Sequence, residues 1–433
     1  MDALTALSAQ FDPLRPLEAA ETDLYVDWQE RLDTADDIKV RLANSIARST
    51  GPVTRLFTGH RGAGKTTELN RVRQRLEAGV GGRRIFVSML FAEQWVHLDD
   101  IQPEDLVYQI VRQLVTDLSA AGFSFAEMKF RNALGGVRDF FKGRVTLDKA
   151  DVGLDPLKLS LKFERFPTAR TEFRTLLRGL LPTIYDLTNN EVLYKAREWL
   201  AEPEHGGYGD IAIIVDQLDR IPRKQLNGYT NHENLFLDHV GALRGLNCDV
   251  LYTIPIELAY SHAHARLQDA YGSEILGLPS VPVTTRGGDA FPDGVAMLCE
   301  IVRRRAVKAG VGLDQVFAEP ELLDEVLRRS GGHIRGLFVL LQSILHRTDE
   351  LPITPAITRR GLRKAAADLA VPLRPLSWEL LTRVHESRDK VGEDQNVWNE
   401  LLRDRFVLAY EDEDGHWYDW NPLLELVEPG RLR

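Results

Sequence analysis

The chain has 433 residues, of which 44% are hydrophobic and 27% are charged. That apolar fraction is ordinary for a globular protein and excludes a disordered one, and the length allows two to four domains of roughly 100–200 residues. The formal net charge of −10 excludes nucleic-acid binding through the surface as a whole. Any contact with nucleic acid must therefore be confined to a local basic patch.

Cysteine content and hydropathy narrow the class further. Two cysteines, Cys248 and Cys299, are too few for a disulfide framework or a four-cysteine zinc site. The start of the chain lacks a basic segment followed by an apolar run, and no stretch reaches the roughly 18 apolar residues that a membrane helix needs. We therefore expect a soluble, cytoplasmic protein with no membrane association.

The first half of the chain alternates between predicted strands and helices. Residues 1–50 are predicted to form a helical leader, because Ile38, Leu42 and Ile46 recur at a spacing of four. Beyond the leader the patterns predict strands at 53–58 and 84–90, and helices at 66–78 and 105–118. This order favours a parallel sheet with helices on both faces.

Residues 122–206 interrupt the alternation and are predicted to be an insertion. Apolar and polar residues alternate from Leu157 to Phe163, which is the period of a half-exposed strand, with a turn at Asp155-Pro156. A long helix is expected over 168–200, with Pro182 as the place where it could break.

The alternation then resumes and gives way to helices. Strands are predicted at 211–215, 248–254 and 280–284, and helices at 233–243 and 256–268, which makes five strands in all. The segment after about residue 290 reads as helical up to the proline-rich stretch 371–375. The tail, 376–433, has two helices followed by two strands, the order of a winged helix.

The strongest motif is Gly59-His60-Arg61-Gly62-Ala63-Gly64-Lys65-Thr66, a complete G-x-x-x-x-G-K-[ST] between a predicted strand and a predicted helix. Glycines let consecutive backbone N–H groups point at a phosphate, and the helix N-terminus adds partial positive charge. In this motif Lys65 bridges the β- and γ-phosphates and the Thr66 hydroxyl holds Mg²⁺. We therefore expect ATP and Mg²⁺ as cofactors, with nucleotide contacts from Gly59, His60, Arg61, Gly62, Ala63, Gly64, Lys65, Thr66 and Thr67.

A second acidic element follows the apolar strand 211–215. Asp216 is expected to hold Mg²⁺ at the carboxyl end of that strand, the alternative being an ordinary strand terminus. Gln217 occupies the position where a glutamate usually orients the attacking water, so Asp219 is the nearest carboxylate for that task. Asp219 could instead cap a turn or pair with Arg220. The glutamine predicts slow hydrolysis.

Three segments together resemble the AAA+ class of P-loop ATPases, close to the STAND and KAP-type proteins and the Orc/Cdc6-like branch. They are G-H-R-G-A-G-K-T-T at 59–67, D-Q-L-D-R at 216–220 and S-G-G-H-I-R-G-L from Ser330. The resemblance covers 51–350, and 376–433 more loosely. It implies an α/β fold with a doubly wound, parallel, five-stranded P-loop sheet, a helical lid and a C-terminal winged-helix-like domain. The expected domains are the leader 1–50, the P-loop ATPase core 51–290, the lid 291–370 and the winged-helix-like domain 371–433.

The resemblance also implies roles for residues outside the two motifs. Arg335, after the glycine pair, matches the second sensor that reaches the nucleotide from the lid, the alternative being a solvated residue at a helix start. Thr253 maps to the first sensor, although a threonine in a strand is more often structural. Arg266 and Arg286 are the candidates for an arginine finger, and neither has a distinctive context.

Charge in the tail bears on the partners. Residues 376–433 carry twice as many acidic as basic side chains, so a phosphate backbone would be repelled there. Basic residues gather in two clusters elsewhere in the chain, for which two interpretations stay open: solvated helix faces, or together a local stripe that binds nucleic acid. The clusters are Arg303-Arg304-Arg305 with Lys308, and Arg359-Arg360 with Arg363 and Lys364. We expect the winged helix to contact protein, either its own ATPase core or a partner.

These observations predict an ATP-binding, Mg²⁺-dependent ATPase with catalytic residues Lys65, Asp216, Asp219 and Arg335 and metal ligands Thr66 and Asp216. It would act as a nucleotide-controlled switch for assembly or partner recruitment, in prokaryotic signalling or antiviral defence, as a homo-oligomer or with a protein effector. The alternatives are a DNA-binding ATPase of the Orc/Cdc6-like or transposition-regulator type, and a nucleotide-binding scaffold without turnover.

Overall fold

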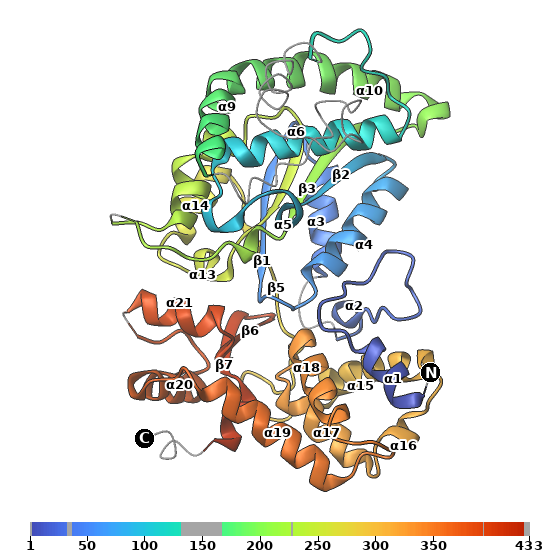
Figure 1. The fold of residues 1–433 in the computed structure, drawn as a ribbon, viewed down its shortest axis with the longest axis vertical. Coiled ribbons are helices and arrows are strands. Elements are labelled where there is room, and N and C mark those ends of the chain that lie inside the picture. The colour runs from blue at the N-terminus through green and yellow to red at the C-terminus, as the bar shows by residue number, and fades with distance from the viewer. Residues whose placement is uncertain (1, 33–36, 131–166, 227, 393, 428–433) are drawn as a thin grey trace.

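The computed structural model describes residues 2–32, 37–130, 167–226, 228–392 and 394–427. An α/β core occupies the upper part of the molecule in Figure 1, and a helical body with a small hairpin lies below it. The predicted strand at 157–163 and its turn at 155–156 fall outside the described residues. Among those described, no helix is both long and apolar enough to span a membrane.

The core is built on one parallel sheet of five strands. Their order is β2-β3-β4-β1-β5. The strands are β1 (Thr54–Gly59), β2 (Ile85–Phe91), β3 (Asp210–Asp216), β4 (Asp249–Thr253) and β5 (Ile275–Leu278). This confirms the predicted α/β class with a doubly wound, five-stranded parallel sheet.

Both faces of the sheet are covered, which is why its strands read as continuous apolar runs. Ile214 packs into a core shared with α3 and α4, whereas Ile213 and Val215 pack into a second core on the opposite face, shared with α6. The helices of the core are α3 (Ile38–Ala47), α4 (Lys65–Ala78), α5 (Ala92–Trp95), α6 (Pro103–Ala120), α9 (Pro167–Leu187), α10 (Tyr194–Ala201), α11 (Asn231–Glu233), α12 (Val240–Leu243), α13 (Ile256–Ala259) and α14 (His264–Tyr271).

Three element predictions in the core were wrong in detail. The last strand lies at Ile275–Leu278 and not at 280–284, where Pro282 lies in an extended linker whose Ser280 and Val281 N–H groups bind carbonyls of the hairpin and the lid. The helix predicted over 256–268 is two helices, α13 and α14. Pro182 does not break α9, because it lies on the exposed face, where water can hydrate the carbonyl that it leaves free.

The lower body contains the lid and the C-terminal hairpin. The lid helices are α15 (Pro292–Lys308), α16 (Leu313–Val316), α17 (Pro320–Arg329), α18 (Ile334–Leu345) and α19 (Pro355–Ala370). After them come α20 (Pro375–Ser387), α21 (Gln395–Arg403), and the antiparallel strands β6 (Val407–Asp412) and β7 (Gly415–Trp420). Two helices followed by a hairpin is the winged-helix order that the sequence predicts.

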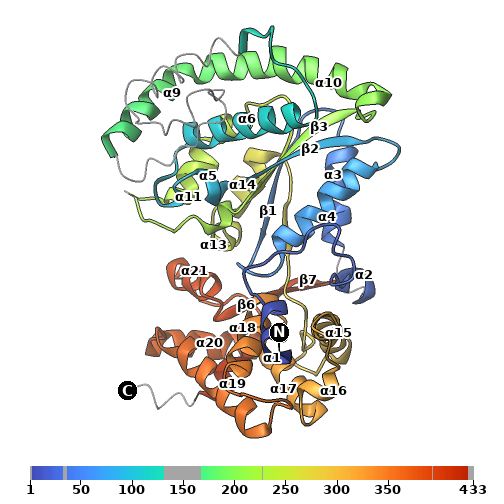
Figure 2. The ribbon, with the colours of Figure 1, turned by 45° about the vertical axis from the view of Figure 1, so that its right-hand side comes forward.

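The N-terminal segment is integrated into this body. It contains α1 (Ala3–Gln10) and α2 (Trp28–Leu32), and α1 lies against the lid in both ribbon views (Figures 1 and 2). Leu7 and Phe11 are buried in the lid core, with the Phe11 ring centroid 5.8 Å from that of Phe338. Residues 12–27, which we call the strap, run from α1 to α2 past the start of α4.

Candidate nucleotide-binding site

The loop between β1 and α4 needs glycine at particular positions. Gly59, Gly62 and Gly64 all have positive φ, at 146°, 94° and 112°. A Cβ on Gly62 would lie 2.4 Å from the Cβ of Arg335, and one on Gly59 would lie 2.7 Å from the carbonyl oxygen of Leu278. The loop therefore requires the glycines both for its backbone conformation and for close contact with the lid and β5.

Lys65, the first residue of α4, is buried in this loop. Its Nζ donates to the carbonyl oxygens of Gly59 at 2.8 Å and His60 at 2.9 Å, and lies 2.9 Å from a carboxylate oxygen of Asp219. The loop lies at the carboxyl end of β1, between β4 and β5, the edge of an open parallel sheet where ligands bind. The ammonium group thus connects the loop to the acidic turn after β3.

The structure brings Thr66 and Asp216 together across the sheet edge. The Thr66 hydroxyl donates to Oδ2 of Asp216 at 2.5 Å, while the other carboxylate oxygen accepts from the Gln217 N–H at 2.7 Å. Burial raises the pKa of Asp216, and the neighbouring Asp219 carboxylate raises it further. A hydroxyl and a carboxylate at this position are hard oxygen donors of the kind that Mg²⁺ prefers.

Gln217 and Asp219 both line the cavity in front of the loop. Gln217 has a φ of 71°, and its Oε1 is buried without a hydrogen-bond partner in the described part of the structure. The turn that carries Asp219 is fixed by Thr253, whose Oγ1 accepts from the Leu218 N–H at 3.1 Å. Thr253 is not among the residues lining the cavity, so its contact with the turn is structural.

Arg335 reaches the same cavity from the lid. Its backbone N–H donates to the Gly62 carbonyl at 3.0 Å and its Nε donates to the Pro13 carbonyl at 2.9 Å. Two residues earlier, His333 caps α18 by accepting from the Gly336 N–H, and its Nε2 lies 2.9 Å from the Arg61 carbonyl. The lid therefore touches the phosphate loop through two neighbouring residues.

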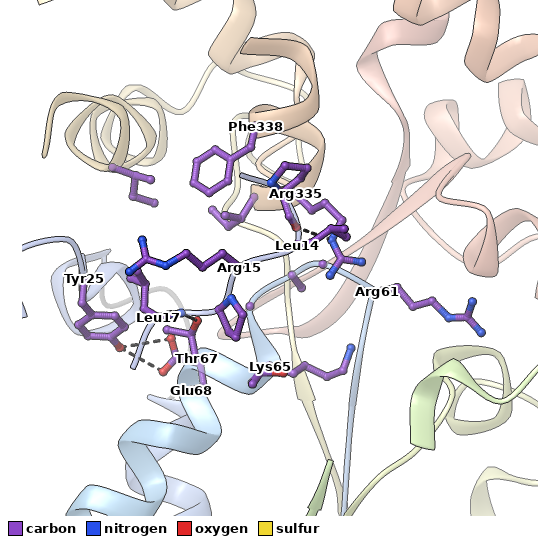
Figure 3. Close-up of a pocket in the computed structure, with 18 of the residues that line it drawn as sticks. Leu14, Arg15, Leu17, Tyr25, Arg61, Lys65, Thr67, Glu68, Arg335 and Phe338 are labelled. Atoms are coloured by element: carbon purple, nitrogen blue, oxygen red, sulfur yellow. Dashed lines mark hydrogen bonds between the residues drawn. The ribbon is translucent and has the colours of Figure 1, made fainter. Parts of the chain in front are cut away.

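The strap completes the cavity, which has a volume of about 150 Å³. Figure 3 shows Leu17 and Tyr25 near the start of α4, Leu14 beside Arg335, and Arg15 between them. The Leu17 N–H donates to Thr67 Oγ1 at 3.0 Å, and the Leu17 carbonyl accepts from Asn70 at 2.9 Å. Sequence reasoning missed the strap and Glu68, because no local pattern links residues that are about 50 positions apart.

The two candidate arginine fingers, Arg266 and Arg286, lie away from the cavity. Arg286 forms an ion pair at 2.7 Å with Asp412 of β6 and donates to the Gly415 carbonyl, so it fastens the hairpin to the linker after β5. The Arg266 side chain is 61% exposed and lies 3.9 Å from Glu233. Neither lines the cavity.

The basic clusters also differ from each other. Arg303 and Arg304 pair with Glu300, Arg305 is buried with its guanidinium 4.6 Å from the Phe338 ring centre, and Lys308 pairs with Asp23. In the first cluster, Arg304 and Lys308 therefore bind the strap, at the Tyr25 carbonyl and at Asp23, whereas Arg303 pairs only within its own helix. In the second cluster Lys364 pairs with Asp368, while Arg359, Arg360 and Arg363 are exposed on α19.

The winged-helix-like region packs against the ATPase core. Trp398, Leu401 and Leu402 of α21 share an apolar cluster with Ile256 of α13. In β6 the Ala409 N–H donates to Nε2 of His60 at 3.0 Å. By its order α21 corresponds to the helix that reads DNA in helix-turn-helix folds, and here its apolar face is covered by the core.

Comparisons with known proteins find distant structural likeness over nearly the whole chain. No protein-family model matches the sequence, and no curated protein matches it. The Walker-type ATPase of Pyrococcus abyssi aligns over 96% of this chain and 99% of its own, at 16% identity and a TM-score of 0.46. The ORC2 protein of Aeropyrum pernix aligns over 98% and 95%, at 14% identity and a TM-score of 0.44. Drosophila ORC bound to DNA aligns over 98% of this chain and 91% of its own, at 12% identity and a TM-score of 0.42.

The fold assignment rests on features of the chain itself. The strand order β2-β3-β4-β1-β5 with a glycine-rich phosphate loop after β1 is the arrangement of AAA+ P-loop ATPases. The lid helices and the terminal hairpin follow in the expected order. By fold, this chain is therefore an α/β protein of the AAA+ P-loop type, with a helical lid and a winged-helix-like C-terminal region.

Proposed function

We propose that the protein is an ATP-binding, Mg²⁺-dependent ATPase of low turnover that acts as a nucleotide-controlled switch. The observation that carries the proposal is the convergence of three elements on one cavity: Lys65 from the loop, the Thr66–Asp216 pair at the sheet edge and Arg335 from the lid. Lys65 would contact the β- and γ-phosphates, and Arg335 would sense the γ-phosphate.

Thr66 and Asp216 would hold the magnesium ion. Their oxygens are already within hydrogen-bond distance, and Asp216 is buried at the carboxyl end of β3. The bound ion would neutralise charge on the β- and γ-phosphates. Asp219 would position water once Lys65 turns from its carboxylate toward a phosphate.

Low turnover follows from Gln217. An amide cannot take a proton from water as a carboxylate does, and base catalysis is worth about 10²–10⁴-fold in rate. The switch function is supported by the contacts of the loop, because His60, Arg61 and Gly62 bind the hairpin and the lid directly. A change of ligand at the loop would therefore alter the contacts of both the hairpin and the lid.

Phosphate release tests this function. We expect slow ATP hydrolysis by the native chain, none by Lys65→Ala, and at least about a tenfold increase in Gln217→Glu, which restores a carboxylate. Gln217→Asn is the matched control, since asparagine tolerates the positive φ without supplying a base. Equal rates for Gln217→Glu and Gln217→Asn would contradict the role given to this position.

A nucleotide-controlled switch needs a partner on which to act. We propose that the switch acts on a separately encoded effector or on a second copy of itself, through the lid and the hairpin that contact the loop. Signalling or antiviral defence is the setting that we propose for such a switch.

A DNA-binding role is the second candidate, and the exposed Arg359, Arg360 and Arg363 on α19 favour it. If this face binds duplex DNA, affinity will fall with rising salt, and neutralising all three arginines will reduce the salt slope by up to about three. Absence of salt-dependent binding by the native chain would exclude this role.

A further inference from the structure

A buried carboxylate that no motif accounts for lies in the nucleotide cavity. Glu68, one helical turn after Lys65 on α4, is only 6% exposed and lines the same cavity as Lys65 and Thr66. The Tyr25 hydroxyl donates to its two oxygens at 3.1 and 3.3 Å (Figure 3). A glutamate this deeply buried needs more hydrogen bonds than one phenol proton can give.

Among the residues that the structure describes, none forms an ion pair with Glu68. The Lys39 ammonium, whose charge acts on Glu68, pairs instead with Asp27 at 2.6 Å and with Asp37. The remaining acceptor positions of the carboxylate therefore match a ligand that brings hydroxyl or N–H donors into the cavity.

The position of Glu68 along α4 indicates which part of a nucleotide it meets. Phosphates bind at the N-terminus of the helix, beside Lys65 and Thr66. Glu68 lies three residues further, about 4.5 Å along the helix axis, and lines the same cavity, so it would face a part of the nucleotide beyond the phosphates. The cavity lining also includes the apolar side chains of Ile301, Phe338 and Trp28, which could contact a base, together with Arg15 and Arg305.

Tyr25 is itself held firmly. The guanidinium of Arg71 lies 4.3 Å from the centre of its ring, and Arg304 donates to its backbone carbonyl. The phenol therefore orients the Glu68 carboxylate from the strap side and leaves the opposite side of the carboxylate to the cavity.

We propose that Glu68, positioned by Tyr25, binds the 2′- and 3′-hydroxyls of the ribose, so that the site selects ribonucleotides over deoxyribonucleotides. The two oxygens of one carboxylate can each accept from one of the two adjacent hydroxyls, as acidic residues do in dinucleotide sites. This inference rests on the proposed function, because it assigns the sugar contact of the same nucleotide.

Calorimetric titration of the native chain with ATP, 2′-deoxy-ATP, 3′-deoxy-ATP and GTP, each with Mg²⁺, tests the inference. We expect each deoxy analogue to bind about tenfold or more weakly than ATP, the loss that accompanies one hydrogen bond to a charged group. Equal affinity for ATP and both deoxy analogues would overturn the inference and leave the proposed function standing. Absence of binding by every nucleotide would overturn both.

Variants separate a sugar contact from a merely structural role. Glu68→Gln keeps an acceptor for Tyr25 but has one oxygen instead of two, so the preference for ATP over 2′-deoxy-ATP should fall below about threefold. Glu77→Gln, on an accessible part of the same helix, is the matched control and should keep the full preference. If Glu68→Gln retains the full preference for ATP over 2′-deoxy-ATP, the carboxylate does not bind the ribose. The same conclusion follows if the native chain prefers GTP over ATP and this variant does not, because these nucleotides differ only in the base.

Discussion

The charges described at the phosphate loop leave one buried carboxylate, that of Asp216, without an ion pair. Lys65 is buried against Asp219, and Asp216 shares a hydrogen bond with Thr66 instead of pairing with a cation. Leaving a carboxylate buried in this way costs free energy, which is visible in the raised pKa of Asp216. A magnesium–triphosphate complex would supply the cation that Asp216 lacks and an anion for Lys65.

Glu68 gives a prediction for stability at this scale. Burial raises its pKa from 4.5 to about 7, so the folded state binds a proton that the unfolded state releases between these values. The ionised group therefore destabilises the fold above about pH 7, and this cost disappears as the pH falls below about 4.5.

We expect Glu68→Gln to raise the free energy of unfolding by about 2 kcal/mol at pH 8 and to have no stabilising effect at pH 4. Urea unfolding at both pH values measures the change, with Glu77→Gln, at a partly exposed carboxylate of the same helix, as the control. A variant that is less stable than the native chain at pH 8 would show that the ionised carboxylate stabilises the fold.

Residues whose signal is local in sequence could be picked out at this scale. The phosphate loop, Asp216 and Asp219 are each recognised from fewer than ten neighbouring residues. The structure gathers residues 61–67 of the loop, Asp216, Asp219 and Arg335 around one cavity, whereas Gly59 and His60 do not line it. Glu68 and Tyr25 could not be found in this way, because their contact joins α4 to a strap more than 40 residues away. Thr253 was assigned as a sensor by analogy, whereas its hydroxyl binds the turn after β3.

At the scale of the elements, strand β6 is hydrogen-bonded to the phosphate loop through His60. The His60 ring is fully buried, and burial lowers its pKa to about 3, so it stays neutral and its Nε2 can accept from the Ala409 N–H. The same strand accepts from Ser280 in the linker after β5 through the Ala409 carbonyl. Ala409 of β6 thus binds both the phosphate loop and the linker that connects β5 to the lid.

We expect His60→Ala to lower the free energy of unfolding by about 1–3 kcal/mol, because the buried Ala409 N–H would lose its acceptor. Chemical unfolding of the variant beside His97→Ala, a histidine away from the loop, measures the difference. If the two variants unfold at the same denaturant concentration, the hydrogen bond does not hold the hairpin to the loop.

Elements with strong periodicity were predicted well, and those that depend on distant packing were not. The run Ile211–Val215 is apolar on both faces and could only be a buried strand. In contrast, β5 is a four-residue strand containing Gly277, and the more β-like sequence at 280–284 competes with it. What selects Ile275–Leu278 is its pairing with β1, which no local pattern encodes.

At the scale of the molecule, the strap, the lid and the winged-helix-like region all meet the phosphate loop. Arg335 binds Gly62 and the strap at Pro13, and α1 packs into the lid core. The segment predicted as the leader, 1–50, is divided in the structure: α1 packs into the lid through Leu7 and Phe11, whereas α3 packs on α4 in the core. Domain order was visible in the sequence, whereas this convergence was not, since it joins segments from both ends of the chain.

This arrangement predicts that nucleotide binding changes assembly. We expect the mass measured by light scattering to differ between the ATP-bound state and the nucleotide-free or ADP-bound states, because His333 and Arg335 join the loop to the lid and the strap. Arg335→Ala should bind nucleotide but lose the difference. The same mass in all three states would contradict a switch that works through assembly.

Equilibrium titration of Mg²⁺ and ATP into the purified chain tests the central claim most directly. The account predicts binding of one nucleotide per chain by the native protein and its loss in Lys65→Ala, because the ammonium group is the main positive charge of the loop. No binding by the native chain, or binding of equal strength by Lys65→Ala, would contradict the account.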